Sequence, residues 1–402
     1  METVDKSTGR AIHVGVNAHL LSLAESYRNA GINKYIQNLL QYLPQADPEM
    51  AFTVFLGEPR YVGAPGLDLR LSRLPTHHPP ARIVWEQALQ PWAIRQEGLD
   101  LIHNLAYVGS LVSPCPSVVT VHDLSFLHYP QGFRTINLFY LRLFTRLSVR
   151  QARRIIADSE STKRDVMRHY GLSPSRVDAV HIGVDTRYQP LPAARVADFR
   201  AEQGLPDRFI LFVGTLEPRK NIGRLLQPYA LLSQERPPLI IVGAKGWLYE
   251  QVFALRESLN LDDEVHFVGY VPGEDLPLWY NAADLFVYPS LYEGFGLPPL
   301  EAMACGTPVV ASNASSLPEV VGEAGLLVDP NDVEALTGAM EQALGDADLR
   351  GTMRARGLTQ ARCFSWEKMA VETADIYRQI LEPPYTVEPQ THLADGEGEN
   401  CV

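Results

Sequence analysis

The densest group of residues that could do chemistry lies between residues 289 and 310. Glu293 and Glu301 stand eight positions apart, and between them lie Gly294, Phe295, Gly296, Leu297, Pro298 and Pro299. The two glycines allow the loop backbone to approach a ligand closely, and the prolines are suited to the start of a helix. A glycine loop that opens a helix is a place for a diphosphate, and Glu301, expected in the first helical turn, suits the adjacent hydroxyls of a ribose. The alternative is one helix-capping glutamate and one surface glutamate.

A second group, GTLEPRKN, runs from Gly214 to Asn221 and follows a strongly apolar run. Arg219 and Lys220 come where a strand is expected to end and a helix to begin. A guanidinium fork and an ammonium at that point could meet phosphate oxygens beside backbone N–H groups. The alternative is a solvated basic pair on a loop.

Two segments of the first half indicate the same kind of site. Gly31 precedes apolar residues at helical spacing, where it either lets a helix N-terminus face an anion or is a plain helix-start glycine. His122 and Asp123 end a strand-like run, so they should point into the cleft beyond the carboxyl ends of the strands. A histidine there can donate to a sugar hydroxyl or a pyrophosphate, and a histidine satisfied within the core is the alternative.

One long stretch is basic and amphipathic. From Leu124 to Ala157 the chain has no Asp or Glu, while Arg142, Arg146 and Arg150 are four residues apart and share one helical face. Aromatic and aliphatic residues are interleaved with them. Such a helix can lie on an anionic membrane surface or meet a phosphate-bearing acceptor, and a core helix with a solvated arginine face is the alternative.

Alternating strand-like and helix-like segments must position these groups. The strand-like runs cover residues 12–18, 52–57, 100–106, 117–123 and 154–159, and then 209–215, 238–244, 265–270, 284–290, 307–312 and 325–330. Strand then helix, repeated, predicts a parallel sheet covered by helices, and the proline-rich stretch 189–207 separates two such sheets. We therefore predict an α/β fold of two doubly wound, Rossmann-like domains facing across a cleft. The domains span 1–190 and 208–363, followed by a closing helix at 364–381 and a flexible tail at 382–402.

Composition excludes several classes of protein. The 402 residues contain 35 Lys and Arg against 47 Asp and Glu, and a net charge of −12 opposes binding to nucleic acid. No run of eighteen apolar residues exists and the N-terminus has no secretory pattern, which predicts a cytoplasmic chain. The four cysteines form no C-x-x-C pair, so we expect free thiols rather than a zinc site or a disulfide framework.

Several strong motifs are missing from the chain. It has no G-x-x-x-x-G-K-[ST], G-x-G-x-x-G, G-x-S-x-G or H-E-x-x-H, which argues against a P-loop enzyme, a dehydrogenase, an α/β hydrolase or a zinc protease. One D-x-D occurs at Asp346 and Asp348, far from the other candidates, and is typical of a surface turn. We expect no essential metal and no cofactor.

At these residues the chain resembles a known family. EGFGLPPLE resembles the E-x7-E motif of the retaining GT-B glycosyltransferases of family 4, and GTLEPRKN, AGINKY and VHDLSF match family segments in the same order. The resemblance covers residues 11 to 381 and looks most like the bacterial mannosyltransferase branch that builds surface polysaccharides. One departure is Thr215, where many members carry an arginine after the glycine.

The resemblance implies a nucleotide-sugar donor in the second domain and the acceptor in the first. Glu293 and the backbone of residues 294–296 would hold the donor sugar, Glu301 the ribose, and Lys220 with Arg219 the diphosphate. His122 would lie near the sugar. The other donor-binding residues that it implies are Gly31, Gly214, Gly269, Tyr270, Val271, Gly294, Phe295, Gly296 and Leu297. On the acceptor side we expect Asp123, Arg142 and Arg146.

The expected reaction is retaining, metal-independent transfer of mannose from GDP-mannose to a glycan or lipid-linked acceptor. Same-face attack is favoured, with the leaving phosphate accepting the acceptor proton, over covalent catalysis by Glu293. A UDP-glucose or other UDP-hexose transferase stays open. A sugar-nucleotide epimerase or hydrolase and a non-catalytic sugar-binding protein are further alternatives. The basic helix adds peripheral contact with an anionic membrane on its inner face.

Overall fold

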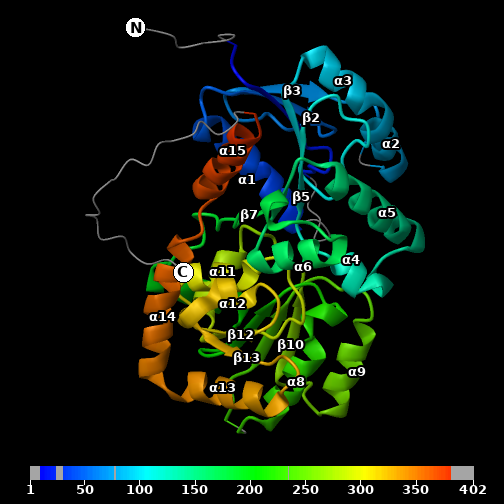
Figure 1. Ribbon diagram of the computed structural model, residues 1–402. Helices are drawn as coiled ribbons and strands as arrows, with labels where there is room; N and C mark the ends of the chain where they lie inside the picture. The colour runs from blue at the N-terminus through cyan, green and yellow to red at the C-terminus, as the bar shows by residue number, and fades with distance from the viewer. Residues whose placement is uncertain (1–9, 24–29, 77, 234, 382–402) are drawn as a thin grey trace.

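The computed structural model describes residues 10–23, 30–76, 78–233 and 235–381, and it contains two parallel β-sheets with helices packed on their faces (Figure 1). The first sheet has the strand order β3-β2-β1-β4-β5-β6-β7. Its strands are β1 (His13–Asn17), β2 (Ala51–Leu56), β3 (Leu67–Leu71), β4 (Leu101–Asn104), β5 (Ser117–Val121), β6 (Arg154–Ala157) and β7 (Val177–Ala179). The tail predicted at 382–402 lies outside the described residues.

The second sheet has the order β10-β9-β8-β11-β12-β13. Its strands are β8 (Ile210–Val213), β9 (Leu239–Val242), β10 (Val265–Gly269), β11 (Leu285–Tyr288), β12 (Val309–Ser312) and β13 (Leu326–Val328). Neighbouring strands pair in parallel in both sheets, as the βα alternation predicts. Two doubly wound, Rossmann-like domains are therefore confirmed.

Helices cover the first sheet and the crossovers between its strands. They are α1 (Ala30–Ala46), α2 (Pro79–Val84), the π-helix η2 (Trp85–Leu89), α3 (Gln90–Glu97), α4 (Ser125–His128), the 3-10 helix η3 (Pro130–Gly132), α5 (Thr135–Gln151), α6 (Glu160–Tyr170) and the 3-10 helix η4 (Pro174–Arg176).

The second half has its own set of helices. They are α7 (Ala193–Gln203), the 3-10 helix η5 (Pro218–Lys220), α8 (Ile222–Leu231), α9 (Glu250–Ser258), α10 (Leu276–Ala282), α11 (Leu297–Ala304), α12 (Leu317–Val321), the 3-10 helix η6 (Gly322–Ala324), α13 (Val333–Gly345), α14 (Ala347–Arg362) and α15 (Trp366–Leu381).

The central strands formed where the sequence has short apolar runs. All four residues of β8, β9, β11 and β12 are buried, because a parallel strand with helices on both faces has no solvent side. The prediction missed β3 and β7. Both lie at the edges of the first sheet, where LDLRL and VDA mix charged with apolar residues and give no continuous apolar signal.

The stretch between the two sheets is not a plain linker. The helix α7 lies within residues 189–207, and its Phe199 ring packs edge-on against Trp279 of α10, with 5.3 Å between the ring centroids. The Arg200 guanidinium donates to the carbonyl of Ala282, so α7 is fixed to the helices of the second half. The structure thus places this segment with the second sheet.

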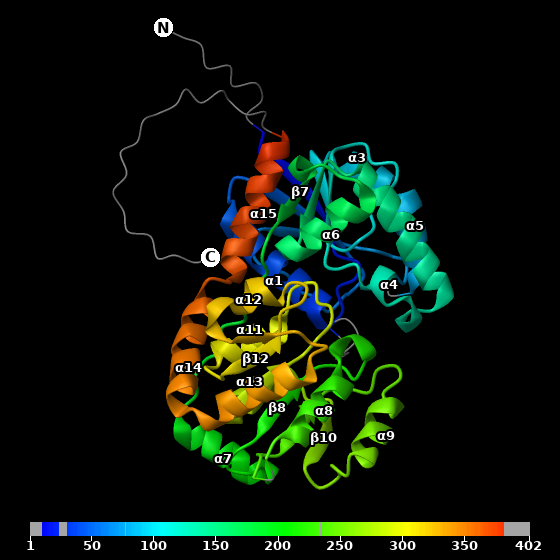
Figure 2. The same cartoon turned by 60° about the horizontal axis from the view of Figure 1, so that its bottom comes forward.

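The last helix returns to the first half of the chain. α15 packs against α1, as Figures 1 and 2 show from two directions. Its Tyr377 is buried and shares a hydrogen bond with His103 of β4, and Arg378 forms ion pairs with Asp47 and Glu49. The two halves are therefore joined at the end of the chain as well as at residues 180–192.

Two expectations about cysteines and membranes can be compared with the structure. Cys115 and Cys305 are free thiols, but Cys363 is disulfide-bonded, so the expectation of free thiols is wrong for Cys363. Within the described ranges, none of the helices combines the length and the apolar character needed to cross a bilayer.

Candidate active site

The candidate site lies at the point where the strand order of the second sheet reverses. β8 and β11 are neighbours at the centre of the sheet, with β9 on one side and β12 on the other, so successive crossovers run in opposite directions. Such a switch point leaves a crevice beyond the carboxyl ends of the two strands. The segment that contains Arg219 and Lys220 follows β8, and the segment that contains Glu293 follows β11. The fold thus brings together two groups that are more than seventy residues apart.

The carboxylate of Glu293 is the centre of this cluster. It is buried, and its Oε1 accepts hydrogen bonds from Lys220 Nζ at 2.7 Å, Ser290 Oγ at 2.6 Å and Tyr288 OH at 3.0 Å. Its Oε2 accepts from a terminal nitrogen of Arg219 at 2.9 Å. Two cations and two hydroxyls therefore hold a single carboxylate in place.

The cluster keeps Glu293 ionised. Burial by itself would raise the pKa of this carboxyl, but the charges of Lys220 and Arg219 and the hydrogen bonds lower it to about 2. Arg219 is also shared, because its Nε pairs with Glu217 Oε1 at 2.6 Å. Lys220 is buried, whereas the side chain of Arg219 retains partial exposure.

Glu301 lies on α11 and faces the first domain. Its Oε1 accepts from Lys34 Nζ of α1 at 2.6 Å, and its Oε2 accepts from Tyr280 OH at 3.0 Å. The expectation that Glu301 lies in the first turn is wrong, because Gly296 is the N-cap and α11 already begins at Leu297. Glu301 is then the fifth helical residue, so it is held by Lys34 rather than by the helix dipole.

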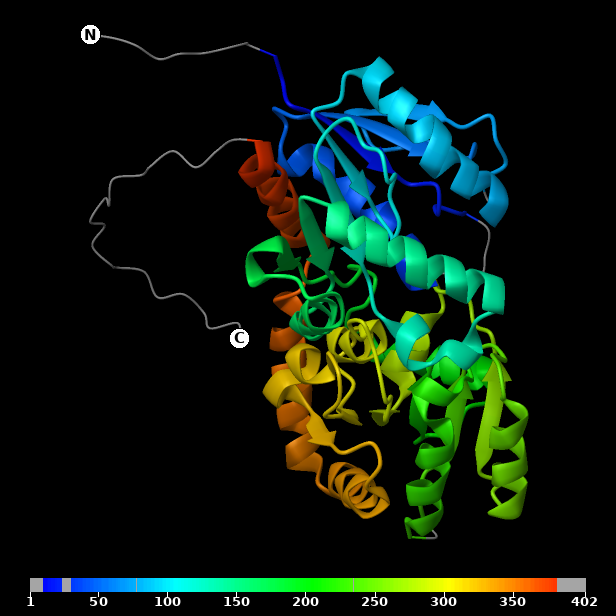
Figure 3. The same cartoon turned by 45° about the vertical axis from the view of Figure 1, so that its right-hand side comes forward.

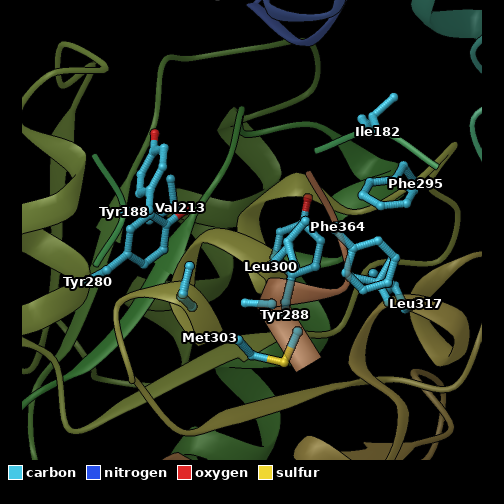
Figure 4. Close-up of a cluster of buried hydrophobic side chains, with 14 of the residues drawn as sticks. Ile182, Tyr188, Val213, Tyr280, Tyr288, Phe295, Leu300, Met303, Leu317 and Phe364 are labelled. Atoms are coloured by element: carbon cyan, nitrogen blue, oxygen red, sulfur yellow. The ribbon is translucent and has the colours of Figure 1, made fainter. Parts of the chain in front are cut away.

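The loop before α11 places backbone, not side chains, at the crevice. Phe295 is buried, and Figure 4 shows its ring among Ile182 and Phe364, 5.5 Å from the Phe364 ring by centroids. Gly296 has a φ of 119°, a conformation that glycine adopts readily. The apolar ring thus anchors the loop. Of the two flanking glycines, Gly296 is buried beside Leu317, whereas Gly294 is half-buried.

Gly294 is one of the points where the two domains touch. Its carbonyl accepts from Ser159 Oγ at 2.6 Å and Thr162 Oγ1 at 3.0 Å, both from the first half. A Cβ at Gly294 would lie 2.0 Å from the backbone oxygen of His122. Only glycine allows these two segments of the backbone to approach so closely.

We expect Gly294→Ala to lower kcat/KM about a hundredfold, because the methyl group forces the two domains apart by a large fraction of an ångström or more. Steady-state kinetics measure the effect. Gly338→Ala is the matched control, since a Cβ at that exposed helical position meets no atom within 4 Å. Equal kinetics for the two variants would contradict a tight domain contact at Gly294.

His122 lies next to this contact with both ring nitrogens occupied. Nδ1 is 2.8 Å from Asp158 Oδ2, and Nε2 is 2.9 Å from the carbonyl of Leu105. A carboxylate and a carbonyl only accept, so both nitrogens must donate and the ring is an imidazolium. Burial opposes the charge, but Asp158 and the hydrogen bonds raise the pKa of His122. The predicted hydrogen bond from His122 to a sugar would require one of these partners to be released.

Asp158→Asn tests this charge state. A raised pKa means that the pair stabilises the fold fully below the unfolded pKa of His122, near 6.5, and loses that contribution as the pH rises through the folded pKa. At pH 6 we expect the variant to lose on the order of 3 kcal/mol of unfolding free energy. The loss should shrink at pH 9, and urea unfolding at both pH values measures it. A pH-independent difference would contradict an imidazolium at His122.

Other predicted residues have more ordinary surroundings. Asp123 Oδ1 accepts from the backbone N and the hydroxyl of Ser125 at 2.9 and 2.8 Å, at the start of α4. Gly31 is exposed near the start of α1, and a Cβ there would meet no atom within 4 Å. Arg142 and Arg146 are exposed on α5, outside the crevice. Arg142 and Arg146 therefore lie away from the Glu293 cluster. Asp123 borders the cluster, because a Cβ at Gly294 would lie 3.0 Å from the Asp123 Cβ and because the charge of Asp123 acts on the Arg219 guanidinium.

The residues implied for the nucleotide base lie along the same strand ends. Gly214 follows β8 and donates its N–H to Val242 of β9, and Gly243 donates to Gly269 at the end of β10. Tyr270 is exposed and Val271 is half-buried just beyond. These residues therefore follow one another from the end of β8 toward β10, the edge strand of the second sheet.

Sequence reasoning missed two residues of the site. Lys34 is part of AGINKY, but nothing near it in the chain is its partner, because Glu301 is 267 positions away. Asp158 directly follows β6, and its position after a strand, like that of His122 after β5, was the available signal. Among the described residues, no three His, Cys, Asp or Glu side chains are grouped so that they could hold a metal ion.

Comparisons with known proteins agree with this geometry. Residues 29–188 match the model for "Glycosyltransferase Family 4", and residues 196–360 match "Glycosyl transferases group 1". The O-antigen chain mannosyltransferase B of Escherichia coli is 41% identical over 268 residues, which are 66% of this chain and 70% of that protein. A D-inositol 3-phosphate glycosyltransferase of Streptomyces scabiei is 31% identical over 388 residues, 87% of this chain and 86% of the relative. The serotype-specific mannosyltransferase WbdA of Escherichia coli is 33% identical over 293 residues, but this chain spans only 36% of its length.

Solved structures share the two-domain arrangement. A sucrose-phosphate synthase from Thermosynechococcus elongatus superposes with a TM-score of 0.73 at 25% identity, covering 92% of this chain and 99% of that one. HepE from Anabaena, solved in complex with UDP and glucose, has a TM-score of 0.70 at 20% identity, covering 92% and 100%. Both likenesses extend over nearly the whole of each chain.

Proposed function

The chain belongs to the GT-B glycosyltransferases with a family 4 first half and a group 1 second half, and from this we propose that it transfers mannose from GDP-mannose to a glycan or lipid-linked acceptor during synthesis of a surface polysaccharide. The observation that supports the proposal most strongly is the buried Glu293 carboxylate clamped by Lys220 and Arg219 beyond the switch point of the second sheet. The similarity to an O-antigen mannosyltransferase supports mannose as the sugar.

In the proposed donor complex, Lys220 and Arg219 face the diphosphate and Glu301 accepts from the ribose hydroxyls. Departure of the nucleoside diphosphate builds negative charge on the β-phosphate oxygens, which preorganised cations stabilise more than the ground state. The two side chains supply the positive charge that a metal would otherwise bring, so we propose metal-independent transfer. Glu293 and the backbone of residues 294–296 hold the hydroxyls of the sugar.

We propose that the configuration at the anomeric carbon is retained by attack on the same face. The bond between that carbon and the β-phosphate oxygen breaks, the acceptor oxygen bonds to the carbon, and the acceptor proton passes to the leaving phosphate. The Glu293 carboxylate accepts four hydrogen bonds from protein donors, and its low pKa makes it a weak nucleophile. Both features favour sugar binding over covalent catalysis for Glu293.

One alternative donor has an observation in its favour. HepE, of the same fold, was solved with UDP and glucose, so a UDP-hexose is the second candidate. An epimerase or hydrolase is less well supported, because it needs free acid and base groups. His122 has both nitrogens bonded within the protein, and Asp123 Oδ1 accepts from the backbone N and the hydroxyl of Ser125.

Thermal unfolding with GDP, UDP and ADP, each with and without EDTA, tests the donor. A ligand that binds only the folded protein stabilises it by about 2.7 kcal/mol at a hundredfold excess over its Kd. We expect GDP alone to raise the midpoint, equally in EDTA. A shift with UDP would change the donor but keep the transferase, and no shift with any of the three would overturn the donor site. A shift that EDTA abolishes would overturn metal independence.

We also propose that α5 holds the protein against the inner, anionic face of a membrane. Figure 3 shows α5, in blue-green, as a long helix on the near side of the first domain. Ile136 and Phe139 of α5 are 83% and 68% exposed, and Arg142 and Arg146 are exposed beside them. Apolar side chains next to arginines can enter a headgroup region that carries negative charge.

Sedimentation with vesicles of phosphatidylglycerol and phosphatidylcholine tests the membrane contact at low salt. We expect the wild type to sediment and Arg142→Ala/Arg146→Ala to lose most of this binding, because each basic residue contributes about 1 kcal/mol near an anionic surface. Arg168→Ala is the control, since its side chain is 82% exposed on α6. A wild type that stays in the supernatant would refute the contact.

A further inference from the structure

A second cavity lies in the first domain, away from the crevice. Its volume is about 750 Å³, within the range of small-molecule sites in proteins. Its lining is formed by Ser113, Cys115, Pro116, Ser117, Arg150, Gln151, Ala152, Arg153, Arg154, Ser175, Arg176, Gln379 and Ile380. Four arginines and three serines therefore face one space, and none of the lining residues is an Asp or a Glu.

The cavity lies at the amino ends of the strands of the first sheet, whereas the donor crevice lies beyond the carboxyl ends. Ser117 is the first residue of β5 and Arg154 the first residue of β6, whereas His122 lies just past the other end of β5. At about 3.3 Å per residue, the five residues of β5 alone separate the two ends by about 13 Å. A ligand in the cavity cannot take part in the transfer step at Glu293.

Two of the four arginines are fixed by the protein. Arg176 donates to the carbonyls of Val149 and Arg150 at 3.0 Å each and also to that of Ala152. Arg154 donates to the carbonyl of Ser175 at 2.6 Å and to Asp178 Oδ1 at 3.2 Å. These hydrogen bonds give both side chains a structural role, and they fix the two guanidiniums at the wall of the cavity.

The other two arginines have no such explanation. Within the described ranges, the guanidiniums of Arg150 and Arg153 make no hydrogen bond and no ion pair, although both residues line the cavity and are exposed. Arg150 lies in the last turn of α5, whose dipole would disfavour an anion, but Arg176 already occupies the free carbonyls of that turn. The negative end of the helix is therefore covered.

The charge of the cavity is not balanced. Among the residues that the structure describes, the four guanidiniums form an ion pair with one carboxylate, that of Asp178, which pairs with Arg154 from outside the lining. Three positive charges remain in a chain whose net charge is −12. Guanidinium forks match the oxygens of phosphate groups in geometry and charge, and serine hydroxyls and glutamine amides add further hydrogen bonds.

From these contacts we infer that the cavity between the end of α5, the start of β6 and α15 is a binding site for a small phosphorylated molecule carrying two or more negative charges. Arg150 and Arg153 supply the free charges, and Arg154 and Arg176 supply the fixed wall. Its volume exceeds what one inorganic phosphate fills, so the ligand carries a further group, either as a soluble phosphate ester or as the headgroup of an anionic phospholipid.

The last helix couples this site to the rest of the chain. Gln379 of α15 lines the cavity and accepts from Arg154 through its Oε1 at 2.9 Å. α15 belongs to the C-terminal part of the chain and packs on α1, so a ligand in the cavity contacts both the first domain and the returning helix. Binding of a ligand in the cavity should therefore also stabilise the packing of α15 against the first domain.

Isothermal titration with inorganic pyrophosphate tests the inference. Arg150→Ala/Arg153→Ala removes two guanidiniums without breaking a hydrogen bond or ion pair of the described part of the chain, and Arg142→Ala/Arg146→Ala removes two arginines of α5 that do not line the cavity. We expect the first variant to lose one pyrophosphate site, or to bind it at least tenfold more weakly, and the second to bind like the wild type. Identical isotherms for all three proteins would overturn the inference.

The number of sites separates this inference from the proposed donor site, which also faces a diphosphate. If both hold, the wild type binds two pyrophosphates and Arg150→Ala/Arg153→Ala binds one. If only the cavity binds, the numbers are one and none, and if only the donor site binds, both proteins bind one. The last outcome refutes the cavity site alone.

Two further arms identify the source of the phosphate. Glycerol 3-phosphate in the same titration represents a soluble ester, and vesicles that contain phosphatidic acid, a phosphomonoester that can carry two negative charges, represent a lipid headgroup. Binding of glycerol 3-phosphate that depends on Arg150 and Arg153 supports a soluble ligand. Vesicle binding that falls at least tenfold in Arg150→Ala/Arg153→Ala, without such binding of the ester, supports a lipid. Failure of both probes together with pyrophosphate overturns the site.

Discussion

Replacement of Lys220 by methionine should lower kcat by about a hundredfold to a thousandfold, the usual cost of removing one preorganised donor to developing negative charge. The Lys220 ammonium is buried and fixed by Glu293 at 2.7 Å and by Tyr288, so it needs no reorganisation when the phosphate leaves. Methionine has a similar length and no charge. Steady-state kinetics with the donor identified by thermal unfolding would measure the loss.

The Lys220→Met variant should still fold, because Glu293 keeps Arg219 and the hydroxyls of Ser290 and Tyr288 as partners. Its circular dichroism and its unfolding midpoint without ligand are the controls. Arg168→Met is the matched variant at an exposed position and should keep the activity of the wild type. A kcat of Lys220→Met within threefold of the wild type would contradict a role of this ammonium in the chemical step.

Glu293→Gln should lower the unfolding free energy at pH 7 by about 3 kcal/mol, since it leaves the buried Lys220 ammonium without this counter-charge. The pKa of Glu293 is lowered from 4.5 to about 2, so its contribution is fully present above pH 4.5 and is lost as the pH falls through about 2. The wild type should therefore lose its advantage over the variant between pH 4.5 and 2. Urea unfolding across that range measures both effects, and parallel pH curves for the two proteins would contradict the ion pair.

The kinetics of the same position separate binding from nucleophilic catalysis. A glutamine can still hydrogen-bond a sugar hydroxyl but cannot form a glycosyl ester by attack of a carboxylate. If Glu293 binds the sugar, Glu293→Gln should keep far more turnover than Glu293→Ala. Both variants could instead lose turnover to the same extent, and a small nucleophile added to the assay could restore turnover only in Glu293→Ala. Covalent catalysis would then replace the proposed same-face attack.

Short motifs in the sequence were sufficient to identify the centre of the site. Lys220 and Glu293 each stand just after an apolar run, and the carboxyl ends of neighbouring parallel strands meet at one edge of a sheet. The βα alternation also predicted both sheets, because a strand buried on both faces must be apolar throughout. The edge strands β3 and β7 were missed because LDLRL and VDA mix charged with apolar residues, whereas the edge strands β10 and β13 are largely apolar and were predicted.

The charge states and the domain contacts could not be predicted from the sequence. His122 is an imidazolium because Asp158, 36 positions later, and the carbonyl of Leu105 both accept from it. Glu301 is held by Lys34, from the other domain, and not by its own helix. Each of these facts depends on a partner that is distant along the chain, and a local pattern carries no information about a distant partner.

The sequence by itself determined the family, the two sheets and the types of residue at the centre, because strands, turns and glycine loops follow from local residue types and their periodicity. The tertiary structure decided which of those residues meet. It brought Lys220 and Arg219 to Glu293, closed the first domain on Gly294, and left Arg142 and Arg146 outside on α5. The physical reason is that hydrogen bonds and ion pairs act over about 3 Å in space, whatever the separation along the chain.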